Sequence, residues 1–427
     1  MLLHFRVKLS YFLQGFKWGF IVLILKFILR KLIRLGTLTL IDSYGKRHVF
    51  GGEEGLSVTI CFTDNLIPWK LVFFPSLALG EGYMDGKIIV ENGTIFDLLS
   101  LFGANLENKN KSGMYEFLEP YRKLFRRFQQ YNPIITSHKN VAHHYDLSNE
   151  LYSMFLDKDL QYSCAYFNTP SSDLESAQEQ KKVHIAAKLF LKGNQNVLDI
   201  GSGWGGMGLF LAKNYEVNVT GVTLSLPQLR VSQQRAIEEH LSDRVTFKLQ
   251  DYRKLTGTFD RIVSVGMFEH VGINQYKIFF ETVEKLLSDD GVILLHTIGR
   301  NTPPSVTDPW IRKYIFPGGY IPALSEISKN IEKTGFFITD IEFLGPHYAN
   351  TLRHWRLRFK KNREIIKSFY DERFCRMWEF YLAASEVAFR YLGMTVYQIQ
   401  LTKQSGIIPI TRDYIEVSKN KIVANKK

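Results

Sequence analysis

The fold is decided by one stretch of sequence, Asn196-Val197-Leu198-Asp199-Ile200-Gly201-Ser202-Gly203-Trp204-Gly205-Gly206. Its apolar half, Val197 to Ile200, stops at glycines, and Met207 to Lys213 after it have the apolar spacing of a helix. The stretch therefore predicts a strand, a tight turn and a helix. Glycines let a ligand approach the backbone, and the helix start offers free N–H groups and a positive dipole end. A nucleotide-like ligand is the expected occupant.

These glycines also fit the fingerprint of a dinucleotide-binding fold. That fingerprint needs an acidic residue roughly 20 positions further on to hold a ribose. Residues 217–237 contain no Asp or Glu, although Arg230 or Arg235 could meet the 2′-phosphate of a phosphorylated nicotinamide cofactor. Asp199 stands where a phosphate would be repelled. The pattern thus favours S-adenosylmethionine, which has no phosphate, and a methyltransferase.

Composition places the chain among ordinary globular proteins with more than one domain. It has 427 residues, of which 45% are apolar and 22% charged. Cys61, Cys164 and Cys375 lie far apart and form no CxxC pair, which argues against a disulfide framework or a structural zinc site and favours a reducing compartment. His138, His143 and His144 lack a carboxylate pair that would complete a ligand set, so no metal site is expected.

The net charge of +12 is concentrated at the N-terminus, where seven Lys or Arg residues precede the first acidic residue, Asp42. The apolar run from Trp18 to Leu29 is interrupted by Lys26 and is shorter than the roughly 20 residues that a spanning helix needs. Residues 1–35 are predicted to form a basic amphipathic helix on an anionic membrane surface, with packing on the next domain as the alternative. Nucleic acid is not an expected partner, because the basic residues alternate with aliphatic ones and no nucleic-acid-binding module is recognisable.

The rest of the chain divides into four predicted segments. They are a small α+β accessory domain at 36–104 that could bind an acyl chain or brace its neighbour, a linker and helix at 105–137, a catalytic-type domain at 138–415 and a basic tail at 416–427. In the accessory domain the pattern predicts strands at Thr37 to Ile41, Leu56 to Phe62, Trp69 to Phe74 and Lys87 to Val90, and a helix at Leu77 to Gly86.

Strands and helices alternate through the catalytic-type domain, which predicts a parallel sheet with helices on both faces. Ligands in such folds bind at the carboxyl ends of the strands. The predicted strands are Val197 to Ile200, Val217 to Thr223, Val245 to Gln250, Arg261 to Val265 and Gly291 to Thr297. Glu269 and His296 follow two of them, and with Cys164 and the glycine turn they indicate acid–base chemistry in one crevice.

A set of motifs along this domain resembles the cyclopropane-fatty-acyl-phospholipid synthase family, which includes the mycolic acid cyclopropane synthases. The motifs are His143 to Asn149, Gln161 to Phe167, Asp199 to Gly206, Thr223 to Ser225 with Gln228, Phe259 to Gly272, His296 to Gly299, Tyr314 to Gly319, and Pro346 to Leu352 with Trp355. The resemblance covers about 37–415. It implies an α/β fold, a Rossmann-like seven-stranded S-adenosylmethionine methyltransferase domain whose last strand, around Val396 to Thr402, is antiparallel.

The resemblance also implies which residues hold the ligands. S-adenosylmethionine would contact Tyr162, Ser163, Asp199, Gly201, Gly203, Gly205, Thr223, Gln228, Asp251 and Tyr252. A bicarbonate ion acting as base would be held by Cys164, Glu269, His296, Ile298 and Tyr348. The candidate catalytic residues are therefore Glu269, His296, Tyr348, Cys164 and Ser385.

Ser385 departs from the family pattern, because ring-forming relatives carry a cysteine there. Cys375 lies ten residues earlier and does not match that site. The implied reaction transfers a methylene or methyl carbon to the cis double bond of an unsaturated phospholipid acyl chain and closes a cyclopropane. The alternatives are a fatty-acid C-methyltransferase that makes methyl- or methylene-branched chains, an amine methyltransferase, and a lipid-binding protein with a vestigial site.

A second basic segment, Arg353 to Arg363, contains six Lys or Arg residues with interleaved aromatics. It is interpreted either as a solvated helix face or as a surface that contacts lipid phosphates. The expected location is cytoplasmic, peripheral on the inner face of the cytoplasmic membrane. The resemblance leaves a homodimer open, and the sequence itself does not fix the oligomeric state.

Overall fold

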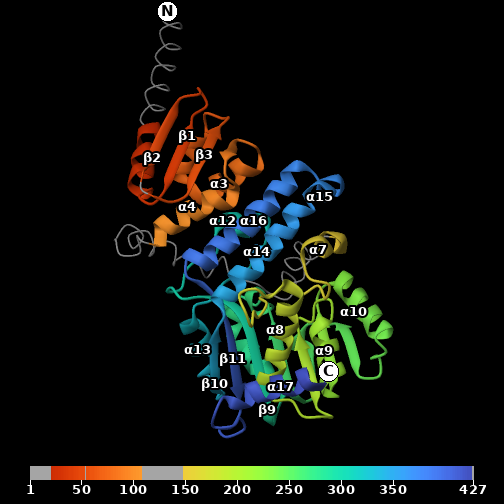
Figure 1. The fold of residues 1–427 in the computed structure, drawn as a ribbon. Coiled ribbons are helices and arrows are strands. Elements are labelled where there is room, and N and C mark those ends of the chain that lie inside the picture. Colours follow the sequence, from red (N-terminus) through yellow and green to blue (C-terminus); the bar gives the residue numbers. More distant parts are fainter. Residues whose placement is uncertain (1–20, 53, 108–147, 426–427) are drawn as a thin grey trace, which may run out of the picture. The chain divides into compact units, whose positions relative to one another are not determined.

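The computed structural model describes residues 21–52, 54–107 and 148–425 (Figure 1). The chain forms two compact units. The first comprises Met1–Gly113, Asp308–Trp310 and Lys360–Leu392, and the second comprises the remainder. This division differs from the predicted one, because residues 360–392 pack with the N-terminal residues instead of staying with 138–415.

The first unit is built on a four-stranded sheet with strand order β2-β1-β3-β4. β1 and β3 are parallel, and the two outer pairings are antiparallel. The strands are β1 (Thr37–Ile41), β2 (Arg47–Gly51), β3 (Ser57–Phe62) and β4 (Ile88–Asn92). β2, a short edge strand with alternating exposure, was not predicted from the sequence.

Helices complete the first unit, and one of them lies where a strand was predicted from the sequence. The predicted strand Trp69 to Phe74 is wrong, because this segment lies largely in helix α2. Pro68 stands in the first turn of α2, where its fixed φ favours a helix start. The helices are α2 (Ile67–Phe73), α3 (Pro75–Met84), α4 (Ile95–Glu107), α15 (Arg363–Phe369) and α16 (Glu372–Tyr391).

Helix α16 packs on α3 and α4 although it lies far along the chain. At Gly103 in α4, an added Cβ would lie 2.8 Å from Val387 and 2.9 Å from Tyr391, so the two helices meet where a side chain is missing. The Tyr83 hydroxyl of α3 also donates to Glu379 of α16 at 3.1 Å. These contacts are the physical reason that residues 360–392 belong to the first unit.

Residues 21–32 form a helix whose two sides differ. Leu25 and Leu29 are buried, while Leu23 and Phe27 are 63% and 62% exposed. Part of the predicted N-terminal helix therefore packs on its own unit, and residues 1–20 lie outside the described part. Within the described residues, no helix combines the length and apolar character needed to cross a membrane.

The second unit contains a seven-stranded sheet with order β10-β11-β9-β8-β5-β6-β7. β5 to β9 run parallel, and β11 is antiparallel to both of its neighbours. This confirms the predicted Rossmann-like sheet with its antiparallel last strand. The strands are β5 (Asn196–Ile200), β6 (Asn218–Thr223), β7 (Val245–Leu249), β8 (Phe259–Val265), β9 (Leu287–Arg300), β10 (Phe337–Phe343) and β11 (Met394–Thr402).

Helices cover both faces of this sheet (Figure 1), and on each face they pack over a separate apolar cluster. In β5, Val197 belongs to the cluster under α8 and α9, and Leu198 belongs to the cluster under α11 and α13. The helices used below are α7 (Asn149–Phe155), α8 (Leu174–Lys188), α9 (Gly206–Tyr215), α10 (Leu226–Glu238), α11 (Tyr276–Leu286), α13 (Leu324–Ile331), α14 (Gly345–Lys361) and α17 (Asp413–Asn425). Residues 416–425 of the predicted basic tail thus belong to α17, which packs on α8.

Candidate active site

The turn after β5 holds the backbone close to the neighbouring strand. The N–H groups of Gly201 and Ser202 donate to the carbonyl of Val222 in β6 at 2.9 and 3.0 Å. Gly201 has a φ of +84°, and a Cβ there would lie 2.7 Å from the Cβ of Met267. Only glycine combines this conformation with this approach. The turn can therefore sit directly against the loop that follows β8.

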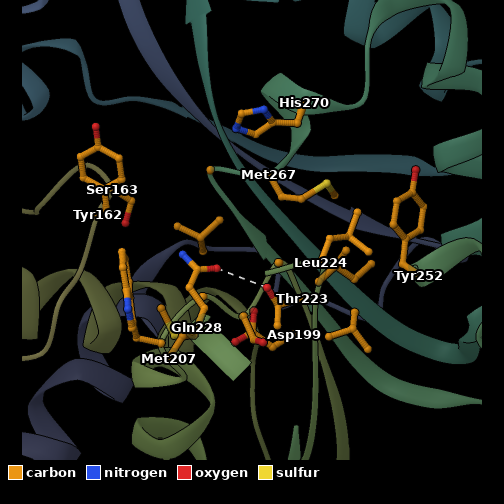
Figure 2. Close-up of a pocket in the computed structure, with 18 of the residues that line it drawn as sticks. Tyr162, Ser163, Asp199, Met207, Thr223, Leu224, Gln228, Tyr252, Met267 and His270 are labelled. Atoms are coloured by element: carbon orange, nitrogen blue, oxygen red, sulfur yellow. Dashed lines mark hydrogen bonds between the residues drawn. The ribbon is translucent and has the colours of Figure 1, made fainter. Parts of the chain in front are cut away.

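A pocket opens at the carboxyl ends of β5, β6 and β8, where the sequence predicted it. Figure 2 shows Tyr162 and Ser163 on one side and Tyr252 on the other, with Met267 and His270 between them. All but one of the residues predicted to bind the cofactor line it, namely Tyr162, Ser163, Asp199, Gly201, Gly203, Thr223, Gln228, Asp251 and Tyr252. The exception, Gly205, takes the N-cap position of α9.

Several pocket side chains are already held by neighbours. The Thr223 hydroxyl donates to the Gln228 side-chain oxygen at 3.2 Å (Figure 2), and the Ser225 hydroxyl caps α10 by accepting from the Gln228 N–H. On the opposite wall, the Asp251 carboxylate is bridged by the Arg253 guanidinium at 2.6 Å. The wall is therefore largely ordered before any ligand enters.

Asp199 is a buried, charged residue of the pocket whose bonding is incomplete. It is 2% exposed, and its Oδ2 has no hydrogen-bond partner within the described residues. Burial raises the pKa of this carboxyl to about 7, and the ammonium of Lys181 opposes that rise. A buried carboxylate without a partner is costly, so a cationic ligand group would stabilise its ionised form.

A second group of polar side chains lies on β9 and on the short helix η2 (Phe268–His270) after β8. Glu269 Oε1 accepts from the Ile298 N–H at 2.6 Å, and His296 Nδ1 contacts the side-chain nitrogen of Gln398 in β11 at 3.1 Å. Because an amide nitrogen only donates, Nδ1 of His296 accepts and the ring proton lies on Nε2. That Nε2 and Glu269 Oε2 have no partner among the residues that the structure describes.

Burial sets the protonation of this pair. It raises the pKa of Glu269 to about 7, while the Ile298 N–H works in the opposite direction. It lowers the pKa of His296 to about 3, and Lys181 adds to that effect. His296 is therefore neutral near pH 7 and can donate from Nε2. Glu269 is close to half protonated there, which suits a group that shares a proton with a small oxyanion.

Cys164 and Tyr348, the other predicted members of this group, are joined through one carbonyl. The Cys164 thiol donates to the Leu344 carbonyl at 3.8 Å, and the Tyr348 N–H donates to the same carbonyl at 3.2 Å. Burial raises the pKa of the Cys164 thiol, so it stays protonated and is not a nucleophile. Four of the five predicted bicarbonate residues are thus linked in pairs, Glu269 with Ile298 and Cys164 with Tyr348, while His296 is held by Gln398.

Ser385, the remaining predicted catalytic residue, belongs to the first unit. It lies half-buried on α16 in the first unit and does not line the pocket. His138, His143 and His144 lie outside the described residues, as do 108–137 of the predicted linker and helix.

Sequence reasoning missed the residues that support the site from behind. Gln178 and Lys181 of α8 hold the pocket wall, and Gln398 fixes the tautomer of His296. From the sequence, two adjacent lysines at 181 and 182 indicate a solvated helix face, but in the structure Lys181 is fully buried. The only local signal was the i, i+3 spacing of Gln178 and Lys181 beside apolar Ala177 and Ile185.

Comparison with known proteins adds family information. The model of the mycolic acid cyclopropane synthetase family matches residues 134–399. The chain is 41% identical to the cyclopropane-fatty-acyl-phospholipid synthase of Escherichia coli, over 77% of this chain and 83% of that protein. It is 35% identical to the tuberculostearic acid methyltransferase of Mycobacterium tuberculosis, over 77% of this chain and 79% of that protein.

A solved structure is similar as well. It is a mycolic acid cyclopropane synthase complexed with S-adenosylhomocysteine and CTAB, with 32% identity and a TM-score of 0.60. The match covers 64% of this chain and 99% of that structure.

Proposed function

Because this chain belongs to the mycolic acid cyclopropane synthetase family, we propose that it is an S-adenosylmethionine-dependent enzyme that converts the cis double bond of an unsaturated acyl chain into a cyclopropane. The family membership confirms the resemblance predicted from the motifs. The proposed substrate is the acyl chain of a membrane phospholipid, as the name of the Escherichia coli relative states for that protein.

The glycine-turn pocket fits S-adenosylmethionine. Its carboxylate without a partner, Asp199 Oδ2, would pair with the α-ammonium group of the ligand, and the hydroxyl and amide of Thr223 and Gln228 would meet its ribose. When bound, the cofactor supplies an electrophilic methyl group. The proposal rests chiefly on the buried carboxyl of Asp199, because its negative form would repel the phosphate of a phosphate-bearing cofactor.

The pair Glu269 and His296 fits a bicarbonate ion. A neutral His296 offers an Nε2–H donor, and the free Oε2 of Glu269 can share a proton with an oxyanion. Ring closure requires removal of a proton from the transferred carbon, and bicarbonate would supply that base. The role of Glu269 and His296 is to hold and orient the base. Both side chains are buried, so the base would be held away from bulk water.

The assay that tests the function combines purified protein, S-adenosylmethionine, bicarbonate and vesicles of cis-unsaturated phospholipid. The fatty acid esters are then analysed by mass spectrometry before and after mild hydrogenation. We expect a product heavier by one CH₂ that resists mild hydrogenation, which indicates a ring. Uptake of hydrogen would reveal a methylene branch instead, a saturated methyl branch would match the tuberculostearic acid relative, and absence of product would overturn the proposal.

We further propose that the enzyme works on an anionic membrane surface, on the cytoplasmic face of the cytoplasmic membrane. The support is the helix at 21–32, where exposed Leu23 and Phe27 lie beside exposed Arg30 and Lys31. Such a face combines apolar insertion with attraction to anionic headgroups. In the second basic segment, Arg358 is instead occupied by Glu175 at 2.6 Å.

Vesicle co-sedimentation tests this surface. Replacement of Arg30 and Lys31 by Ser should weaken binding to anionic vesicles by roughly tenfold or more, since each basic residue near the surface contributes about 1 kcal/mol. The matched control replaces Lys46 and Arg47, which are exposed on the same unit, by Ser. Wild-type binding that ignores anionic lipid content and salt, or equal loss in both variants, would contradict the proposal.

A further inference from the structure

Helix α8 carries a lysine in the interior of the second unit. Lys181 is 0% exposed, whereas its neighbour Lys182 reaches Asp159 at 2.7 Å and keeps some exposure. A buried ammonium is costly unless it is hydrogen-bonded and paired, so its surroundings show what it stabilises. The reaction steps above do not use Lys181.

Lys181 contacts the segment that forms one wall of the cofactor pocket. Its Nζ donates to the Ser163 hydroxyl at 2.8 Å and to the Gln161 side-chain oxygen. One turn earlier, the Gln178 side-chain amide donates to the carbonyls of the same two residues at 3.0 and 3.1 Å. Because the segment is neither helix nor strand, these side chains of α8 replace the backbone partners that regular structure would provide.

The charge of Lys181 acts on both halves of the site. It opposes the rise in the pKa of Asp199 in β5, adds to the fall in the pKa of His296 in β9, and favours the thiolate form of Cys164. Burial lowers the pKa of Lys181 itself to about 8, and nearby Asp157 counteracts this. The ammonium is therefore largely present at neutral pH.

Other carboxylates near Lys181 already have ion-pair or hydrogen-bond partners of their own. Asp159 is bridged by Lys182 and by Arg235 of α10, and Asp157 accepts the N–H groups of residues 159 and 161. Asp199 has no such bonds on Oδ2 within the described residues, and the positive charge of Lys181 opposes the rise in its pKa.

We infer that Lys181 is a positioning residue of the cofactor site, whose ammonium fixes the wall segment Gln161–Ser163 and brings a positive charge to the pocket that Asp199 also lines. This inference rests on the proposed function, since it takes S-adenosylmethionine as the occupant. It assigns to a buried lysine of α8 an electrostatic role in ligand binding in addition to its packing.

The test is the pH dependence of S-adenosylhomocysteine affinity, measured by calorimetry between pH 5.5 and 8.5. Wild-type affinity should fall as pH decreases through the pKa of Asp199, about 7. In Lys181→Met this midpoint should move up by about one pH unit, so that binding is about threefold weaker at pH 7.5 and recovers toward pH 8.5. Lys181→Gln, which keeps a donor but no charge, should show the same displacement if the methionine variant does not fold.

The matched control is Lys188→Met. Lys188 is equally buried on the same helix, but it is the last residue of α8 and forms ion pairs with Asp340 and Glu342. The control variant should lose stability and keep the wild-type midpoint. Loss of affinity by the same factor at every pH in both Lys181 variants, or an equal displacement in Lys188→Met, would overturn the inference. Failure of the wild-type protein to bind S-adenosylhomocysteine would instead overturn the proposed function, and the two failures are thus distinguishable.

Discussion

Asp199 and Glu269 are two buried carboxyls with the same pKa, about 7, and opposite surroundings. Asp199 lines the cofactor pocket, its Oδ2 has no hydrogen-bond partner within the described residues, and the charge of Lys181 opposes the rise in its pKa. The Glu269 carboxylate accepts the Ile298 backbone N–H, and burial raises its pKa against that hydrogen bond. The first is prepared to meet a positive ligand, and the second is prepared to hold or share a proton. The chemical division of the site follows from this contrast.

The largest effect is expected from Glu269→Gln. The amide keeps the oxygen that accepts the Ile298 N–H but cannot share a proton with the base, so turnover should fall by roughly 10² to 10⁴-fold. S-adenosylhomocysteine affinity, measured by calorimetry, should stay within about twofold, because Glu269 is not among the residues that line the cofactor pocket. Turnover within tenfold of wild type would remove Glu269 from the proposed base site.

The same variant tests the protonation of Glu269 in the free protein. The folded pKa of about 7 lies above that of an unfolded glutamate, so Glu269 contributes stability at low pH that is lost as pH rises through 7. Glu269→Gln has no such loss, and its stability relative to wild type should improve by about 2 kcal/mol from pH 5 to pH 8. Urea unfolding at both pH values measures this change, and a constant difference would contradict the raised pKa.

A smaller effect, confined to binding, is expected from Asp199→Asn. Removing the charge should weaken S-adenosylhomocysteine binding about 10- to 100-fold, as for a hydrogen bond to a charged group. The dependence of affinity on pH around 7 should disappear with it. Asp243→Asn, a change at an exposed carboxylate, is the control. An Asn variant with unchanged affinity would end the contrast between the two carboxyls.

The smallest effect is expected from Ser385→Ala. The change removes one hydroxyl from a half-buried residue of α16 that is not among the residues lining the pocket, so turnover should stay within about twofold. Ser385→Cys, which restores the residue of ring-forming relatives, should be equally neutral. Turnover below a thousandth of wild type, in a folded alanine variant that still binds cofactor, would show that this position is catalytic.

The cofactor wall could be predicted from the sequence because its signals are local. The glycine turn follows its strand directly, and the strand ends bring Thr223 and Asp251 to the same edge of the sheet. The group around Glu269 is different, since Cys164 and Tyr348 lie in separate parts of the chain and meet at the Leu344 carbonyl. Spacing alone could not join them, and only the family resemblance did.

The errors have physical causes as well. The aromatic run Trp69 to Phe74 has the composition of a strand, but Pro68 and tertiary packing select a helix. Lys181 was overlooked because a lysine on a helix is usually solvated, and its burial depends on partners at 161 and 163. The membership of α16 in the first unit depends on packing against α4, which no local pattern indicates.

The packing of α16 on α3 and α4 also affects the order in which the protein can form during synthesis. The bond between Tyr83 and Glu379 joins residues 296 positions apart, and Trp310 contacts Met84 across 226. The core formed by α3 and α4 therefore closes only after α16 has been synthesised. Until then the surfaces of α3 and α4 that later receive α16 are exposed, and exposed apolar surface of this kind favours aggregation of an incomplete chain.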